Sequence, residues 1–317
     1  MNQQHWEEYY RHGSIAAYPP GEELDCDAQV HQAWIEFFSA CPDGARILDI
    51  GTGNGIVAKI ARETAVELGR QWDIHGIDLA QINPLKHVTA AEQRLAGITF
   101  HAGIAAESLP FEDGSIDAVC GQYALEHMDI ARVLAEVHRV LKPDGRAQFI
   151  IQHAGSWLVR NAQVSLKEAD FILRELKIYR RLAKLVASEK NTTARAARSA
   201  GTDLRQAIQI IKRERPKAQA AGGGVVFHYT LEAVQKLLQL RTKYPPNAVE
   251  KEIELAEANL RAWVRRLNDL DGNARDENGM QGIEQAAAAA SLRVKERVAL
   301  QHSRTGLVDW RLLLQPG

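Results

Sequence analysis

Apolar residues at positions 45–153 fall into two alternating patterns: short continuous runs, and stretches in which every third or fourth residue is apolar. The runs predict strands and the periodic stretches predict helices. We expect strands over residues 45–50, 72–78, 98–101, 115–122 and 147–152. We expect helices over residues 56–68, 88–95 and 130–141, the last stopped by a turn at Lys142-Pro-Asp-Gly145. This alternation predicts a parallel sheet with helices on both faces.

After His153 the helical spacing continues without strands. Ser165 and Glu168 have the spacing of a capping box, which predicts the start of a helix with an apolar stripe from Ile172 to Val186. Three further helices are expected, over Leu204–Ile211, from a cap at Thr230 to Leu240, and over Ile253–Leu267. The glycines 222–224 and an extended piece, residues 225–229, are expected to separate the second from the third. These stripes predict a helical bundle, or helices packed on the sheet.

The strand pattern returns near the end of the sequence. Residues 282–292 are rich in alanine and predict a helix, and residues 294–300 and 307–314 predict a pair of strands. Because strands resume there, residues 154–278 are predicted to be a helical insertion. Residues 1–153 and 279–317 would then form one α/β domain, a mostly parallel sheet that ends in an antiparallel strand pair.

Composition places the chain among globular proteins. Of its 317 residues, 45% are hydrophobic and 25% are charged, and no apolar run approaches the length of a membrane span. The first residues lack the pattern of a secretory signal. Three cysteines without C-x-x-C spacing favour neither a disulfide framework nor a cysteine zinc site. We therefore expect a cytoplasmic protein without a membrane span and without a metal.

The net charge of −1 conceals an uneven distribution. Residues 160–217 contain 15 Lys and Arg against 6 Asp and Glu. Two clusters stand out, Arg174, Lys177, Arg180, Arg181 and Lys184 in one, and Lys212, Arg213, Arg215 and Lys217 in the other. They are interpreted either as solvated helix faces or as sites for phosphate or carboxylate groups.

The candidate chemistry begins after the first predicted strand, in Asp49-Ile-Gly51-Thr-Gly53-Asn-Gly55. Glycines there let the backbone turn tightly and let a ligand approach the main chain. The spacing is G-x-G-x-G, which differs from the G-x-G-x-x-G of dinucleotide binders because residue 56 is Ile. A glycine triplet can be a purely structural turn. An acid before it and Asp78 at the end of the second strand favour a ribose-containing ligand.

These residues resemble the class I S-adenosylmethionine (SAM)-dependent methyltransferases, in particular the broad group that includes the ubiquinone/menaquinone methyltransferases. Further motifs of that group are matched by Ala106-Glu-Ser-Leu-Pro-Phe-Glu-Asp-Gly-Ser-Ile-Asp117, Leu125-Glu-His127 and Leu141-Lys-Pro-Asp-Gly145. Together the motifs cover about residues 45–153. The resemblance implies a Rossmann-like methyltransferase sheet, SAM as cofactor and methyl transfer as the activity.

The resemblance also implies roles for particular residues. The loop Gly51, Thr52, Gly53 and Gly55 would hold the methionine and ribose parts of SAM, with Asp49 near the methionine amino group. Asp78 would bind the ribose hydroxyls, Leu79 would flank the adenine, and the N–H of Ala106 would face the ring. The group often has Asp where this chain has Ala105, so Glu107 or backbone groups would have to bind the adenine amino group.

Residues at the carboxyl ends of the last two parallel strands are the candidates for acceptor chemistry, because ligands of open α/β sheets bind there. Gln122 is expected to contact the cofactor, and Tyr123, His127 and His153 are the candidate catalytic bases or orienting groups, with Glu126 beside them. Each of these side chains can equally be structural. The aromatic residues near the start, Trp6, Tyr9, Tyr10 and Tyr18, are interpreted either as a flap over SAM or as simple packing.

Three functions compete at this point. The favoured one is a methyltransferase for a small-molecule acceptor, an anionic one by the charge of the insertion, with the helical insertion as an acceptor-binding cap. The second keeps the enzyme but replaces the acceptor with RNA or another nucleic acid, although no RNA-binding module is recognised in the sequence. The third is a catalytically silent SAM-binding scaffold whose helices bind a protein partner, or a second copy as a homo-oligomer.

Overall fold

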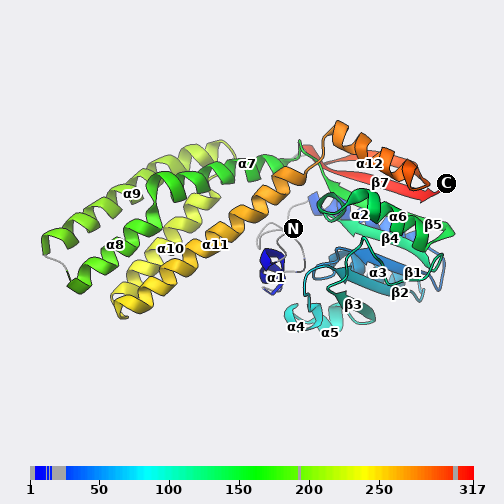
Figure 1. The fold of residues 1–317 in the computed structure, drawn as a ribbon, viewed down its shortest axis with the longest axis horizontal. Helices are drawn as coiled ribbons and strands as arrows, with labels where there is room; N and C mark the ends of the chain where they lie inside the picture. Colours follow the sequence, from blue (N-terminus) through cyan, green and yellow to red (C-terminus); the bar gives the residue numbers. More distant parts are fainter. Residues whose placement is uncertain (1–3, 12, 14, 16–25, 192–193, 303–305) are drawn as a thin grey trace. The chain divides into compact units, whose positions relative to one another are not determined.

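The chain divides into two units in the computed structural model, which describes residues 4–11, 13, 15, 26–191, 194–302 and 306–317. The sheet unit comprises Met1–Trp157 and Asn273–Gly317, and the helical unit comprises Leu158–Gly272 (Figure 1). The insertion expected from the sequence, residues 154–278, is a few residues longer at each end than the helical unit. The difference arises because residues 154–157 and 273–278 belong to the sheet unit.

The sheet unit contains one seven-stranded sheet with the order β3-β2-β1-β4-β5-β7-β6. Its strands are β1 (Arg46–Ile50), β2 (Asp73–Asp78), β3 (Ile98–Ala102), β4 (Ile116–Gln122), β5 (Leu141–Gln152), β6 (Leu292–His302) and β7 (Gly306–Pro316). Strands β1 to β5 pair in parallel, and β7 runs antiparallel to both β5 and β6. The predicted fold class, a mostly parallel sheet with a terminal antiparallel strand pair, is confirmed.

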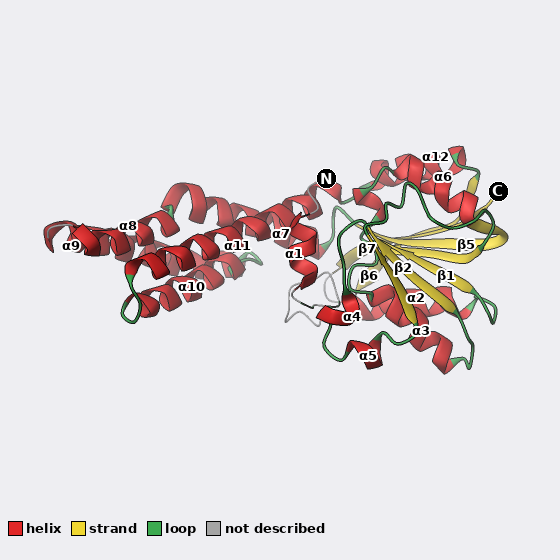
Figure 2. Cartoon of the chain, turned by 60° about the horizontal axis from the view of Figure 1, so that its bottom comes forward, coloured by secondary structure: helices red, strands yellow, loops and turns green. Residues whose placement is uncertain are grey.

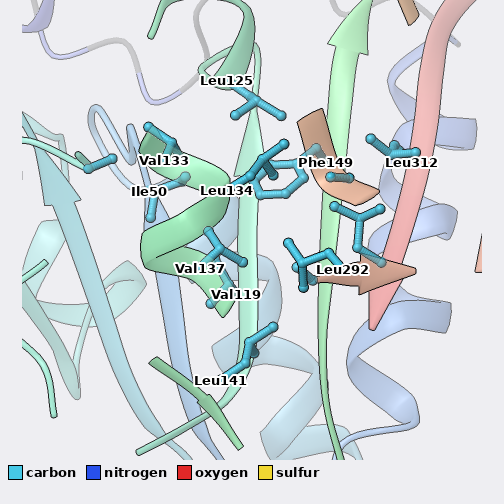
Figure 3. Close-up of a cluster of buried hydrophobic side chains, with 14 of the residues drawn as sticks. Ile50, Val119, Leu125, Val133, Leu134, Val137, Leu141, Phe149, Leu292 and Leu312 are labelled. Atoms are coloured by element: carbon cyan, nitrogen blue, oxygen red, sulfur yellow. The ribbon is translucent and has the colours of Figure 1, made fainter. Parts of the chain in front are cut away.

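Helices cover both faces of this sheet (Figure 2). Helices α6 (Ile130–Val140) and α12 (Glu277–Ala289) pack on one face, and α2 (Cys26–Ser39) and α3 (Ile56–Glu67) pack on the other. The core on the α6 side includes Leu134, Phe149 and Leu312, none of which is exposed to solvent (Figure 3). Burying each such side chain stabilises the fold by roughly 1.5–3 kcal/mol. This core therefore fixes the positions of the strands whose ends carry the candidate site.

Two local predictions in the sheet unit are wrong. Residues 142–145 do not form a turn that separates a helix from a strand, because β5 begins at Leu141. Leu141 pairs with Ile116, and the pairing resumes at Arg146 opposite Ala118, so residues 142–145 form an irregularity within β5. The helix expected over 88–95 is instead two single turns, α4 (Pro84–His87) and α5 (Ala91–Arg94), because Val88 is extended and interrupts the helix.

The helical unit is built from antiparallel helices around a core of its own. They are α7 (Trp157–Asp170), a π-helical segment (Phe171–Leu176), α8 (Ile178–Asn191), α9 (Ala194–Ala220), α10 (Val225–Arg241) and α11 (Pro246–Asn273). The apolar stripes read from the sequence meet in this core, which includes Ile172, Leu204 and Ile253. Of the predicted alternatives, the stripes form a bundle.

The predicted capping box at Ser165 and Glu168 is wrong, because both residues lie inside α7. The Glu168 carboxylate instead accepts hydrogen bonds from the backbone N–H groups of Gly224, at 2.5 Å, and Val226, at 3.2 Å. These groups form the start of α10, so Glu168 caps a helix that is distant in sequence. The extended piece at 225–229 and the cap at Thr230 are therefore wrong too, since α10 begins at Val225 and Thr230 is buried within it.

The single helix expected from Ile172 to Val186 is broken at Lys177, which has a left-handed backbone with φ of 49°. The Arg181 side chain satisfies the break, because its Nε–H donates to the carbonyl of Leu176 at 2.6 Å. The same guanidinium also forms an ion pair with Asp203 of α9. Arg181 is thus engaged inside the α8–α9 hairpin.

None of the helices within the described ranges is long and apolar enough to cross a membrane.

Candidate functional site

The glycine loop links the end of β1 to the start of α3, at the carboxyl edge of the parallel strands. Gly51, Gly53 and Gly55 all have left-handed backbones, with φ between 53° and 87°. A Cβ on Gly51 would lie 2.5 Å from the Cβ of Ala124, which follows β4. The loop therefore needs glycine both for its conformation and for its close approach to the neighbouring strand end.

Asp49 lies buried beneath this loop. Its Oδ2 accepts a hydrogen bond from the hydroxyl of Thr52 at 2.6 Å, and its Oδ1 has no hydrogen-bond partner among the described residues. Burial raises the pKa of Asp49 to about 7, while the Thr52 hydrogen bond opposes the rise and the nearby Asp78 adds to it. A buried carboxylate oxygen without a donor is the feature that a ligand ammonium group would complete.

Asp78 ends β2 beside the same loop. Its Oδ2 accepts the N–H of Gly53 at 2.9 Å, and its Oδ1 accepts the N–H of Ala80 at 2.8 Å. Burial raises the pKa of Asp78, and these two backbone hydrogen bonds oppose the rise. Each carboxylate oxygen retains a lone pair, so the geometry fits two further hydroxyl donors, as in a ribose.

The residues expected around adenine lie at the ends of β2 and after β3. Leu79, which directly follows Asp78, is half-buried, and Ala106 is buried. The Glu107 carboxylate accepts the N–H of Asp129 at 3.1 Å, which directs it toward the start of α6. The contact involves one of the two carboxylate oxygens, so both Glu107 and the backbone of residues 105–106 stay candidates for binding the adenine amino group.

Helix α1 (Gln4–Arg11) lies against the glycine loop. A Cβ on Gly53 would lie 2.6 Å from the ring of Tyr10, and the Asn54 amide donates to the carbonyl of Tyr10 at 3.0 Å. Burial and the nearby carboxylate of Asp78 raise the pKa of Tyr10. Trp6 and Tyr10 stack on one helix, while Tyr18 of the expected aromatic flap lies outside the described residues.

The end of β4 carries Gln122 and Tyr123. The Gln122 side-chain oxygen accepts the indole N–H of Trp34 at 2.7 Å, so this side chain packs toward α2. Tyr123 has a left-handed backbone with φ of 54°, a strained conformation for a residue with a side chain. Its hydroxyl donates to the buried carboxylate of Asp309 on β7 at 2.6 Å. Strain of this kind is often found at functional sites.

Glu126 and His127 form a short 3₁₀ turn after β4. Glu126 is buried and accepts the N–H of Gln152 at 2.9 Å, and burial raises its pKa to about 7. His127 lies next to the ring of Trp6, with centroids 6.1 Å apart. These contacts connect the 3₁₀ turn both to the end of β5 and to α1.

His153 follows β5, and its ring stacks on Trp310 with centroids 4.5 Å apart. The backbone N–H of Gly155 donates to Nδ1 at 2.8 Å, so Nδ1 holds a lone pair and the proton of a neutral ring lies on Nε2. Burial lowers the pKa of His153, which keeps the ring neutral near pH 7. Its geometry therefore supports a hydrogen-bond donor through Nε2 better than a proton acceptor.

The structure thus brings Asp49, the glycine loop and Asp78 together, and it adds residues that the sequence did not single out. Asp309 is the clearest of these, because it is a completely buried acid in the mostly apolar strand segment 307–314. Its position in a run whose one other charged residue is Arg311 was the available signal. Arg275, which donates to the carbonyl of Glu126 at 2.9 Å, had no recognisable motif.

Comparison with known proteins agrees with this geometry. Residues 48–149 match the methyltransferase domain family. Over 112 residues the chain is 36% identical to a ubiquinone/menaquinone biosynthesis C-methyltransferase of Geotalea uraniireducens, covering 33% of this chain and 44% of that protein. Over 132 residues it is 32% identical to the 2-phytyl-1,4-naphtoquinone methyltransferase of Nostoc punctiforme, covering 40% and 56%. The chain thus spans about half the length of these relatives.

A match to a solved structure extends over more of the chain at lower similarity. The YcgJ protein of Bacillus subtilis is 15% identical, with 90% of this chain and 99% of that chain covered and a TM-score of 0.36.

The strand order, the glycine loop and the two carboxylates define the class of this part of the molecule: residues 48–149 are a class I SAM-dependent methyltransferase domain, with SAM as its cofactor. Within that class, the domain is related to the ubiquinone/menaquinone methyltransferase-like group.

Proposed function

We propose that this chain is an enzyme that transfers the methyl group of SAM to a small-molecule acceptor of the quinol or phenol type. The acceptor class is suggested by the relatives named for ubiquinone, menaquinone and naphthoquinone methylation. An anionic acceptor bound by the clustered cations of the insertion has less support, because Arg181 of that cluster is already bound to Asp203 and Leu176.

The observation that carries the proposal is the pair of buried carboxylates around the glycine loop. Asp49 presents an oxygen without a hydrogen-bond partner in the described structure, and Asp78 organises the loop through the N–H of Gly53. The N–H groups of Gly53 and Ala80 compensate the burial of Asp78, whereas the Oδ1 of Asp49 has no donor among the described residues, and such a buried atom costs several kcal/mol. An ammonium group would supply this donor, and the remaining lone pairs of Asp78 would accept the ribose hydroxyls.

When bound, SAM supplies a methyl group on a positively charged sulfur. The chain's own residues would then position the acceptor and accept its proton where it has one. Tyr123, His127 and His153 surround the carboxyl ends of β4 and β5. Of these, Tyr123 with Asp309 is the proton-transfer candidate, because its hydroxyl already donates to a carboxylate, and His153 is the donor that orients an acceptor oxygen.

Calorimetry with S-adenosylhomocysteine tests the cofactor site. Asp78→Asn removes the charged acceptor of the Gly53 N–H and of the ribose, so we expect affinity to fall at least tenfold, since each hydrogen bond to a charged group is worth roughly 1.5–3 kcal/mol. Asp73→Asn is the matched control, because Asp73 lies at the opposite end of the same strand and its side chain is 56% exposed. Equal affinity of the Asp78 variant and the wild type would refute the cofactor assignment.

Methyl transfer itself is measured with radiolabelled SAM and a demethylated naphthoquinol kept reduced, with a simple catechol as the second acceptor. Label in the organic phase with either acceptor supports the proposed class. If the chain binds S-adenosylhomocysteine but labels neither, the acceptor part of the proposal is wrong while the cofactor site stands.

A further inference from the structure

The solvent-facing side of α9 carries cations without carboxylates. The buried residues of α9, Ala200, Leu204, Ala207 and Ile211, recur every three or four positions and so define its inner side. With about 3.6 residues per turn, the opposite side of the helix is formed by Arg195, Arg198, Ser199, Thr202, Arg205, Gln206, Gln209, Lys212, Arg213, Pro216 and Lys217. We call this side the α9 outer face. It contains no acid and no large apolar residue.

Within the α9 outer face, three cations form a straight line. Arg198, Arg205 and Lys212 are separated by seven residues each and all are exposed. A seven-residue step is close to two turns, so these side chains leave the helix in nearly the same direction. At about 1.5 Å per residue, the line from Arg198 to Lys212 is about 21 Å long.

The acids of α9 lie at the flank of this face and are already paired. Asp203 binds Arg181 of α8, and Glu214 binds Arg213 and Lys217, each at 3.0 Å. In the part of the chain that the structure describes, no carboxylate lies within ion-pair distance of Arg195, Arg198, Arg205 or Lys212. These four cations are thus available to an external anion.

The charge is specific to one half of the helical unit. Residues 171–220, which include α8 and α9, contain 13 Lys and Arg against 4 Asp and Glu, whereas residues 225–272, which include α10 and α11, contain 7 of each. A helical bundle that needed cations only for solubility would not require this asymmetry, since mixed charges serve that purpose on α10 and α11.

We propose that the α9 outer face binds the phosphodiester backbone of single-stranded nucleic acid. A line of cations about 21 Å long matches an extended polyanion better than a small anion, which one or two cations would hold. The exposed amide side chains of Gln206 and Gln209 stand beside the cations, and such groups supply phosphate contacts alongside Arg and Lys. The Thr202 hydroxyl instead donates to the carbonyl of Arg198 at 3.0 Å. Apart from Pro216, the α9 outer face offers no apolar side chain to insert among lipids, which distinguishes it from a membrane-binding helix.

This inference is independent of the proposed methyl transfer, because it concerns binding by the helical unit and not the acceptor. The α9 outer face has no aromatic side chain on which bases could stack, so the binding is expected to rest on the phosphates and to depend strongly on salt.

The test is fluorescence anisotropy of the full chain with a labelled single-stranded RNA of about 20 nucleotides, long enough to cover the whole cation line, titrated from about 50 to 200 mM salt. The variant R198Q/R205Q/K212Q removes the line. The matched control K236Q/K243Q/K251Q removes three exposed cations of the α10–α11 half, none of which forms an ion pair with a carboxylate among the described residues. Thermal unfolding of all three proteins checks that each is folded.

We expect the R198Q/R205Q/K212Q variant to bind the RNA at least tenfold more weakly at the lowest salt, and the control to bind like the wild type. The slope of log K against log salt should fall by about 2, because each lost phosphate contact with a single strand contributes about 0.7. Equal weakening in both variants would show general charge attraction and overturn the proposal. So would a wild type that binds vesicles of anionic lipid through these residues but does not bind RNA.

Discussion

Asp49 is the residue whose chemistry can be followed most directly by pH. Its pKa in the free protein is raised to about 7 from an ordinary value of 3.8, chiefly by burial, so the protonated form predominates below pH 7. A bound ammonium group favours the ionised form, and binding below pH 7 must therefore release a proton. We expect the affinity for S-adenosylhomocysteine to rise roughly tenfold from pH 6 to pH 7.5.

The measurement is calorimetry at several pH values, in buffers with different ionisation enthalpies so that released protons are counted. The Asp49→Asn variant should bind more weakly but without this dependence on pH. Glu126→Gln is the control, since burial raises the pKa of Glu126 to about 7 as well, and its carboxylate accepts the N–H of Gln152 on β5 and not a group of the glycine loop. If the pH dependence disappeared in the Glu126 variant and persisted in the Asp49 variant, the ammonium assignment would be wrong.

His153 gives a second prediction at this scale, because its tautomer is fixed by the N–H of Gly155 donating to Nδ1. Two-bond hydrogen–nitrogen correlation spectra of ¹⁵N-histidine-labelled protein should show a bare Nδ1 and a protonated Nε2 between pH 6.5 and 8, since burial also lowers the pKa of the ring. The signal is assigned by its loss in His153→Gln. A proton on Nδ1 would contradict the donor role inferred for this residue.

Among the elements, α10 shows how a tertiary contact can replace a local signal. The sequence pattern at Ser165 and Glu168 predicts a helix start, but α7 passes through both residues and Glu168 reaches the N-terminus of α10. The partner lies 56 residues away, so no local pattern could have revealed it. A carboxylate at a helix N-terminus satisfies backbone N–H groups and opposes the positive end of the helix dipole.

Glu168→Ala is expected to lower the free energy of unfolding of the helical unit by roughly 2–4 kcal/mol, because two buried N–H groups lose a charged acceptor. Denaturant unfolding measures this loss, and hydrogen exchange should show faster exchange at residues 224–228 than elsewhere in the unit. Glu175→Ala is the control, since Glu175 is exposed on the π-helical segment. If both variants lost the same stability, the hydrogen bonds from Gly224 and Val226 to Glu168 would contribute nothing, and the prediction would be wrong.

The sheet and the cofactor loop were predictable because their signals are local. The runs that form β1 to β7, the glycine spacing and the acids at the ends of β1 and β2 can each be recognised within a few residues. The contacts between distant segments could not be predicted in this way. Tyr123 reaches Asp309 across 186 positions, and the break at Lys177 depends on Arg181 and its pairing with α9. Such contacts depend on how elements pack, which periodicity does not encode.

At the scale of the whole molecule, the chain leaves the sheet unit and returns to it through two segments that are hydrogen-bonded to each other. The N–H of Arg275 donates to the carbonyl of Gln152 at 2.8 Å, and the N–H of Ala154 donates to the carbonyl of Arg275 at 2.9 Å. The indole N–H of Trp310 donates to the same carbonyl at 2.8 Å. These contacts all lie within the sheet unit. The two segments that connect the sheet unit to the helical unit are therefore held together by the sheet unit alone.

The helical unit can therefore be removed by a short Gly/Ser linker that joins residue 157 to residue 273. All residues assigned to the cofactor precede residue 123, and the core on both faces of the sheet is formed by residues of the sheet unit. We expect the shortened protein to bind S-adenosylhomocysteine with an affinity within about threefold of the full chain, and to lose methyl transfer if the helical unit supplies the acceptor site.

Calorimetry and the naphthoquinol assay measure the two properties separately. Loss of cofactor binding in a shortened protein that still unfolds cooperatively would show that the helical unit is part of the cofactor site. Retained methyl transfer would instead place the acceptor site within the sheet unit.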